Sequence, residues 1–311
     1  MEKIKPNNGD GGERPPDDPR EILHRAMLRA RPSFKDFEGA PGYSEAELWK
    51  DKGWLAWKNA QIENNGEHSS SDVYARDMEP ILVYILNDEK LFPTRESFSF
   101  WASEYDDKRN GTDAVFGVQN RKTKEGMAFS VDVTTDTLVG EVKEKFRKSF
   151  DVYQGKSYIK YCMHKDKRWR EPNAPHFVLG MSPASQDKAL SKIIITDGEL
   201  KGRERDADSD FIILSEIKEQ ISLHLTILNK KPKTDAVKQM IDNLGDLLPA
   251  VYSALSSTLG IKSSEYPSKK ECEEAFQKKY SKKREELARF DDVYRNIINV
   301  AIQRARGKKA L

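Results

Sequence analysis

Two aspartates lie in a segment whose pattern otherwise favours apolar β-strands. The stretch GTDAVFGVQNRKTKEGMAFSVDVTTDT, residues 111–137, predicts two strands around a polar turn. If the turn is centred on the Lys122–Thr123 bond, residues whose numbers sum to 245 lie opposite each other. Asp113 and Asp132 then become direct cross-strand neighbours, with their Cβ atoms roughly 5 Å apart.

Two facing carboxylates need compensation, because like charges directly opposite each other destabilise a hairpin. A divalent cation, a neighbouring Lys or Arg, or a raised pKa on one carboxyl would each provide it. Carboxylate oxygens are the ligands that Mg²⁺ prefers, so the pair predicts a magnesium site at Asp113 and Asp132. The alternative is that both residues lie at exposed strand ends and serve turns and caps, where Asp is common.

The elements around the hairpin alternate between helix and strand. The segment 70–89 predicts a helix that carries Glu79, with Pro80 either in its first turn or at a kink. A shorter helix is predicted at 94–107, from Phe98, Trp101, Ala102 and Tyr105 at helical spacing. Residues 137–150 predict another helix, and residues 157–164 and 176–182 predict two further strands.

In this order the chain resembles the PD-(D/E)XK nuclease superfamily, over roughly residues 72–182. The resemblance implies an enzyme that cuts DNA or RNA with Mg²⁺. It implies Asp113 and Asp132 as the metal ligands and Glu79 as the acid contributed by the helix. The family pattern has a lysine two residues after the second acid, where this chain has Thr134. Some members carry that lysine on the following helix, which makes Lys143 the predicted substitute.

A basic and aromatic segment follows the helix of residues 137–150. Lys165, Lys167, Arg168 and Trp169 are predicted to contact nucleic acid, because cations bind phosphates and aromatic rings stack on bases. The alternative is an edge strand whose lysines prevent pairing with another chain.

The chain divides into three segments by composition. Residues 1–19 are rich in Gly, Pro, Asn and charge and are predicted to form a disordered tail. For residues 20–183 the resemblance implies a nuclease-like α/β core with N-terminal helices, in which a small mixed sheet is flanked by helices. Residues 184–311 show long apolar stripes at helical spacing, which predict a helical hairpin or bundle. The fold class expected is therefore α+β with a long-helix C-terminal region.

The overall composition indicates the cellular location of the protein but not its activity. The net charge is only +2, so any attraction to nucleic acid must be local. The two cysteines lie far apart, and no segment approaches the ~20 apolar residues that span a bilayer. We therefore expect a cytoplasmic protein that does not enter a membrane. Two functions stay open: a Mg²⁺-dependent nuclease or nuclease-like nucleic-acid-binding protein, and an inactive scaffold that binds a protein partner through its C-terminal helices.

Overall fold

The computed structural model describes residues 18–64, 73–122, 126–135, 137–151, 159–164, 167–171, 174–196 and 198–306. The tail predicted at residues 1–19 therefore lies outside the described residues, except for Asp18 and Pro19. Asp18 begins the first helix, because its side chain accepts a hydrogen bond from the Arg20 N–H while Pro19 occupies the first helical position.

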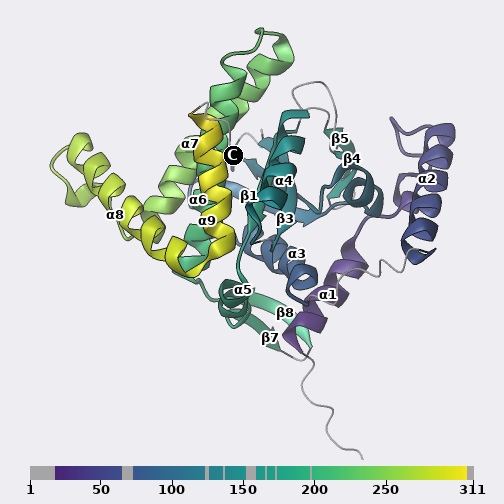
Figure 1. Ribbon diagram of the computed structural model, residues 1–311, viewed down its shortest axis with the longest axis horizontal. Helices are drawn as coiled ribbons and strands as arrows, with labels where there is room; N and C mark the ends of the chain where they lie inside the picture. The colour runs from purple at the N-terminus through teal and green to yellow at the C-terminus, as the bar shows by residue number, and fades with distance from the viewer. Residues whose placement is uncertain are drawn as a thin grey trace, which may run out of the picture.

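The protein has an α+β fold (Figure 1), as the sequence predicts. The α-helices are α1 (Pro19–Ala30), α2 (Glu45–Asn64), α3 (Val73–Leu86), α4 (Val139–Asp151), α5 (Pro183–Leu190), α6 (Ala207–Leu228), α7 (Asp235–Thr258), α8 (Lys269–Phe290) and α9 (Asp292–Ala305). The strands are β1 (Glu96–Trp101), β2 (Ala114–Gln119), β3 (Gly126–Thr134), β4 (Ile159–His164), β5 (Lys167–Glu171), β6 (His176–Gly180), β7 (Ile193–Thr196) and β8 (Glu199–Arg203). Among the described residues, no helix is long and apolar enough to span a membrane.

A four-stranded sheet in the order β1-β2-β3-β6 forms the centre of the protein. Strands β1, β2 and β3 are antiparallel, and β6 lies parallel to β3 after the chain has crossed over through α4. Strands β4 and β5 form a separate ladder, and so do β7 and β8. The order of elements through this centre is α3, β1, β2, β3, α4 and β6.

Helices cover both faces of this sheet. On one face, α3 packs on Phe116, Phe129 and Val131 in the largest hydrophobic cluster, which also includes residues of α6, α7, α8 and α9. On the other face, Val142 and Phe146 of α4 pack with Val178 of β6 and with α9. In Figure 1, α6 to α9 lie to the left of the strands labelled β1 and β3, and α2 lies to their right.

The structure corrects two predicted elements. The segment predicted as a helix at 94–107 instead forms strand β1, followed by helical turns only at its end. The C-terminal region, predicted to be helical throughout, also contains the hairpin of β7 and β8. The helix with Pro80 begins at Val73, so the proline lies inside α3 rather than in its first turn.

Candidate active site

The predicted register of the hairpin is confirmed. Ala114 pairs with Val131 and Gln119 with Gly126, so paired residue numbers sum to 245. Asp113 lies just before this ladder, and its N–H donates to the Val131 carbonyl at 2.8 Å, so the pairing shifts by one residue at Asp113. The Val133 N–H then donates to Asp113 Oδ2 at 2.6 Å, so the Asp113 carboxyl lies across the end of β3.

The closeness of the two aspartates changes the acidity of Asp113. Burial of its carboxyl and the negative charge of Asp132 raise the pKa of Asp113 to about 8, and Asp107 acts in the same direction. The positive charge of Lys145 opposes these effects but does not cancel them. At neutral pH Asp113 is therefore largely protonated, which is one of the compensations that the sequence argument requires.

Asp132 is held by a lysine of the following helix. Asp132 is 2% exposed, and its Oδ1 accepts a hydrogen bond from Lys145 Nζ at 2.6 Å. The same ammonium donates to the Val133 carbonyl at 2.7 Å. Asp132 Oδ2 lies 3.9 Å from Nε2 of the buried His176, on the neighbouring strand β6. The His176 ring is in turn oriented by Ser130, whose Oγ lies 2.9 Å from Nδ1.

The lysine that reaches the acids is Lys145 and not Lys143, the residue that the sequence favoured. Val142 and Phe146 form a buried stripe along α4. Lys143 and Lys145 lie on opposite flanks of that stripe. The flank with Lys145 is the one turned towards the end of β3. The backbone carbonyl of Lys143 accepts a hydrogen bond from the Arg304 side chain.

Glu79 of α3 belongs to the same electrostatic group. Burial raises the pKa of Glu79 well above its usual range, the nearby charge of Asp113 raises it further, and Arg31 opposes both. Its Oε1 atom is buried, with no hydrogen-bond partner among the described residues. Glu79 of α3 therefore lies close to Asp113, which in turn lies close to Asp132 of β3.

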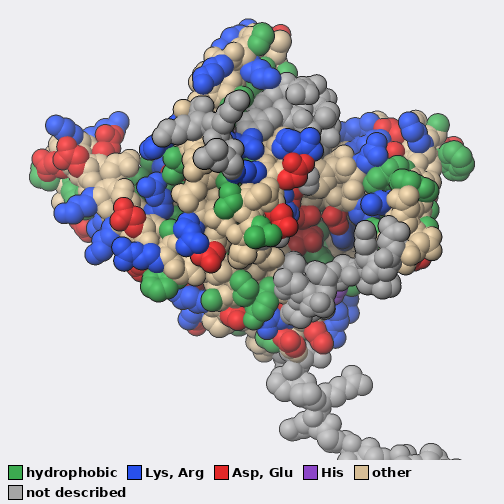
Figure 2. All heavy atoms as spheres, viewed as in Figure 1, with side chains coloured by type: hydrophobic (Ala, Val, Ile, Leu, Met, Phe, Trp, Pro, Cys, Tyr) green, Lys and Arg blue, Asp and Glu red, His purple; other side chains and the backbone are tan. Residues whose placement is uncertain are grey.

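Arg31 and Asp107 complete the group, and sequence reasoning missed both. Arg31 Nη2 binds Asp107 Oδ2 at 2.5 Å, and its Nε donates to the Ala102 carbonyl at 3.0 Å. Burial would lower the pKa of Arg31, but the charges of Asp107, Glu79 and Asp113 outweigh it and raise the pKa. Figure 2 shows acidic side chains gathered in a recess near the middle of the molecule.

The part of the chain that the structure describes contains no group of three or more His, Cys, Asp or Glu side chains already arranged around a metal position. The charge of Asp132 instead raises the pKa of Asp113, and the charge of Asp113 raises the pKa of Glu79, so each carboxyl lies close to the next. Such a donor set suits Mg²⁺, which usually takes one or two protein carboxylates and keeps several waters.

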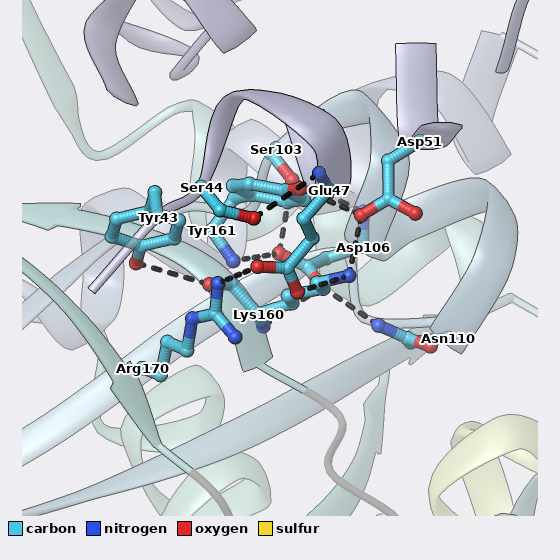
Figure 3. Close-up of polar contacts among 10 residues, drawn as sticks. All are labelled: Tyr43, Ser44, Glu47, Asp51, Ser103, Asp106, Asn110, Lys160, Tyr161 and Arg170. Carbon is cyan, nitrogen blue, oxygen red and sulfur yellow. Dashed lines mark hydrogen bonds and ion pairs between the residues drawn. The ribbon is translucent and has the colours of Figure 1, made fainter. Parts of the chain in front are cut away.

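Part of the basic and aromatic segment makes contacts within the protein, with helix α2 (Figure 3). Arg170 of β5 pairs with Glu47 of α2 at 2.5 Å, and Lys160 of β4 pairs with both Glu47 and Asp51. Tyr161 donates its hydroxyl to Asp51 at 2.6 Å. These contacts attach α2 to the β4–β5 ladder, so Lys160 and Arg170 serve structure first.

The predicted nucleic-acid contacts themselves are only partly described. Arg168 is exposed on β5 and donates its Nε–H to the Asp36 carbonyl. Lys165 lies outside the described residues. Lys167 and Trp169 belong to β5, and their side chains are likewise not described. The assignment of these four residues to nucleic acid stays a prediction.

Comparison of the chain with family models, with curated proteins and with solved structures gives no match.

Proposed function

We propose that this protein is a divalent-metal-dependent nuclease whose site is formed by Glu79, Asp113, Asp132 and Lys145. The observation that carries the proposal is the hydrogen bond of Lys145 Nζ to Asp132 Oδ1 at 2.6 Å. It supplies the lysine that the sequence lacks at Thr134. The order α3, β1, β2, β3, α4 and β6 supports the resemblance to the PD-(D/E)XK nucleases, because the acids come from the corresponding helix and strands.

The residues present fit a magnesium ion. Asp113 and Asp132 would hold it, because their mutual repulsion is relieved when a cation lies between them. The buried Oε1 of Glu79 would bind a water of the metal shell. A bound divalent ion supplies water activation and stabilises charge that develops on phosphate oxygens.

The chain's own residues have separate roles. Lys145 keeps the Asp132 carboxylate in place and brings a positive charge beside the acids, where it would stabilise negative charge developing on a scissile phosphate. Asp113 holds a proton at neutral pH until a cation displaces it, since its pKa is about 8. Arg31 offsets part of the acidic charge near Glu79 and Asp113.

Cleavage of labelled single- and double-stranded DNA and RNA, with Mg²⁺ or Mn²⁺ and with EDTA, tests the proposal. We expect the wild type to cut one of these substrates only with metal, and Asp132→Asn to abolish cutting. Lys145→Met should lower kcat by about 10²- to 10³-fold, comparable to the loss of one oxyanion donor. The matched control is Lys143→Met, on the opposite flank of the same helix, which should keep wild-type activity.

Calorimetric titration separates the outcomes. Absence of divalent-ion binding at millimolar concentration would contradict the metal site and remove the main support for a nuclease. Metal binding without cleavage of any of these substrates would instead favour the inactive scaffold that binds a partner through α6 to α9. Equal loss of activity in Lys143→Met and Lys145→Met would contradict the role given to Lys145.

A further inference from the structure

Three polar side chains share the face of the sheet that α4 covers, and Asp132 is one of them. Ser130 and Asp132 are two residues apart on β3, so both side chains point to the same side of the sheet. His176 pairs with Ser130 in the parallel ladder of β3 and β6, so its ring lies on that side too. The surroundings are otherwise apolar, because Val178 of β6 packs there against α4 and α9.

His176 is fully buried in these apolar surroundings. One of its ring nitrogens is bound by Ser130, whose Oγ lies 2.9 Å from Nδ1. The other ring nitrogen, Nε2, is the one that lies near Asp132, 3.9 Å from Oδ2. Burial of a polar ring costs stability unless polar partners compensate, and an apolar residue at position 176 would simply extend the cluster of Val178. The imidazole therefore has a role that an apolar side chain could not fill.

The distances around Ser130 determine which ring nitrogen carries the proton. The Ser130 hydroxyl has two acceptors within reach, Nδ1 of His176 at 2.9 Å and the Pro175 carbonyl at 3.5 Å. The shorter distance is that of a full hydrogen bond, so the hydroxyl donates to Nδ1 and the ring proton lies on Nε2, near Asp132. In the opposite tautomer the hydroxyl would be left with the long contact to Pro175, and a lone pair of Nε2 would face the carboxylate.

We propose that His176 is a positioning residue that orients the Asp132 carboxylate for a divalent cation, an inference that rests on the proposed function. Lys145 holds Oδ1 of this carboxylate at 2.6 Å, and the Nε2–H group of His176 attracts Oδ2 from the neighbouring strand. Together they fix the plane of a buried carboxylate, where the low dielectric strengthens both interactions. At 3.9 Å the contact with His176 is longer than a hydrogen bond, so it orients Oδ2 without occupying a lone pair that a cation would use.

The backbone on either side of the ring is also fixed. His224 of α6 donates its Nε2–H to the His176 carbonyl at 3.0 Å, and burial lowers the pKa of His224 to about 4, so this donor is neutral at physiological pH. The Ser130 N–H donates to the Pro175 carbonyl at 3.0 Å. His176 therefore acts on Asp132 from a rigid position, as the outer partners of metal-binding carboxylates do.

The tautomer of His176 can be measured without metal or substrate. Nitrogen-15 NMR of the histidine-labelled full chain distinguishes protonated from unprotonated ring nitrogens, and the His176 signals are assigned by their loss in His176→Gln. We expect the Nε2–H form in the wild type. Ser130→Ala should give a mixture of both forms, because it lacks the hydroxyl that donates to Nδ1. The Nδ1–H form in the wild type would overturn the proposal, whether or not the protein is a nuclease.

Calorimetric titration with Mg²⁺ tests the role of the ring. The amide of Gln can place an N–H group where Nε2 lies, whereas the shorter amide of Asn reaches only the position of Nδ1. His176→Asn should weaken Mg²⁺ binding by about 10-fold or more, and His176→Gln should recover most of that loss. Leu223→Ala is the matched control, because it opens a cavity in the same buried cluster from α6. It should lower the Tm and leave Mg²⁺ binding at the wild-type value.

The outcomes separate this inference from the proposed function. A wild type that binds no Mg²⁺ at millimolar concentration would contradict the proposed function, and with it the cation that His176 serves. A wild type that binds Mg²⁺, with equal losses of affinity in His176→Asn and His176→Gln, would leave the nuclease proposal standing and overturn only the role of His176. The same holds if the loss of affinity follows the loss of Tm, so that Leu223→Ala binds Mg²⁺ as weakly as His176→Asn.

Discussion

The raised pKa of Asp113 leads to a defined dependence of stability on pH. In the unfolded chain an aspartic acid titrates near pH 4, whereas Asp113 in the folded protein titrates at about 8. Between these values the folded state binds one more proton than the unfolded state, so the free energy of unfolding falls as the pH rises. The stabilising effect is fully present below pH 4 and is lost by pH 8.

The size of the effect follows from the shift. Each pH unit in this window lowers the free energy of unfolding by about 1.4 kcal/mol, and four units lower it by on the order of 5 kcal/mol. For 311 residues the unfolding entropy is about 0.65 kcal/mol/K, so the Tm falls by about 2 °C per pH unit. Glu79 adds to the trend, because its pKa is also raised.

Asp113→Asn isolates the effect. Asparagine resembles the protonated acid and its Oδ1 can still accept from the Val133 N–H. Calorimetric Tm values of the two proteins should therefore be similar at pH 4.5 and differ by several degrees at pH 8, with the variant more stable. Asp242→Asn, at an exposed position of α7, is the control and should follow the wild type at every pH.

Magnesium provides the second half of this test. A divalent ion binds the ionised pair and competes with the proton, so Mg²⁺ should raise the wild-type Tm more at pH 8 than at pH 5. In Asp113→Asn this pH-dependent gain should be much smaller. If wild type and Asp113→Asn give parallel Tm profiles from pH 4.5 to 8 without metal, the two aspartates do not interact as described.

Three further predictions concern other parts of the protein. Replacing Lys165, Lys167 and Arg168 with Ala should reduce the salt dependence of nucleic-acid binding by about one unit of slope per lost phosphate contact, measured by fluorescence anisotropy. An unchanged slope would indicate that these residues instead prevent an edge strand from pairing with another chain. Glu216→Gln should change the unfolding free energy little, because burial raises the pKa of the Glu216 carboxyl and so favours its neutral form, whereas Glu216→Ala should cost about 1–3 kcal/mol by leaving the Gly180 N–H unpaired. Gly180→Ala should be strongly destabilising in a thermal melt, since its Cβ would lie 2.2 Å from the Thr134 carbonyl oxygen.

The hairpin was predictable because strands alternate strictly and because the turn fixes the register. Those two rules bring Asp113 close to Asp132, although the pairing shifts by one residue at Asp113. Strand β1 was assigned wrongly because Phe98, Trp101, Ala102 and Tyr105 also fit a helix. The alternation of Ser97 and Ser99 with Phe98 and Phe100 was the signal for a strand. A six-residue strand followed by helical turns satisfies both periods in succession.

The choice between Lys143 and Lys145 depends on tertiary structure. The stripe of Val142 and Phe146 shows that α4 packs on the sheet, but it does not show which flank meets the acids. That depends on the direction in which α4 crosses from β3 to β6. Thr134 could not accept a lysine easily, because it is 3% exposed and lies against the backbone of Gly180. The close approach of β6 thus explains why the cation comes from α4 rather than from β3.

The edge of β6 shows why the C-terminal helices matter to the site. Gln220 of α6 accepts from the Val178 N–H and donates to the Val178 carbonyl, as a neighbouring strand would. Glu216 and His224, four residues to either side, bind the backbone of Gly180 and His176. The spacing of these three polar residues can be seen in the sequence, but the strand that they contact cannot. Helix α6 therefore completes the hydrogen bonding of the strand beside Asp132, and the change of composition near residue 183 does not separate the sheet from the helices that close it.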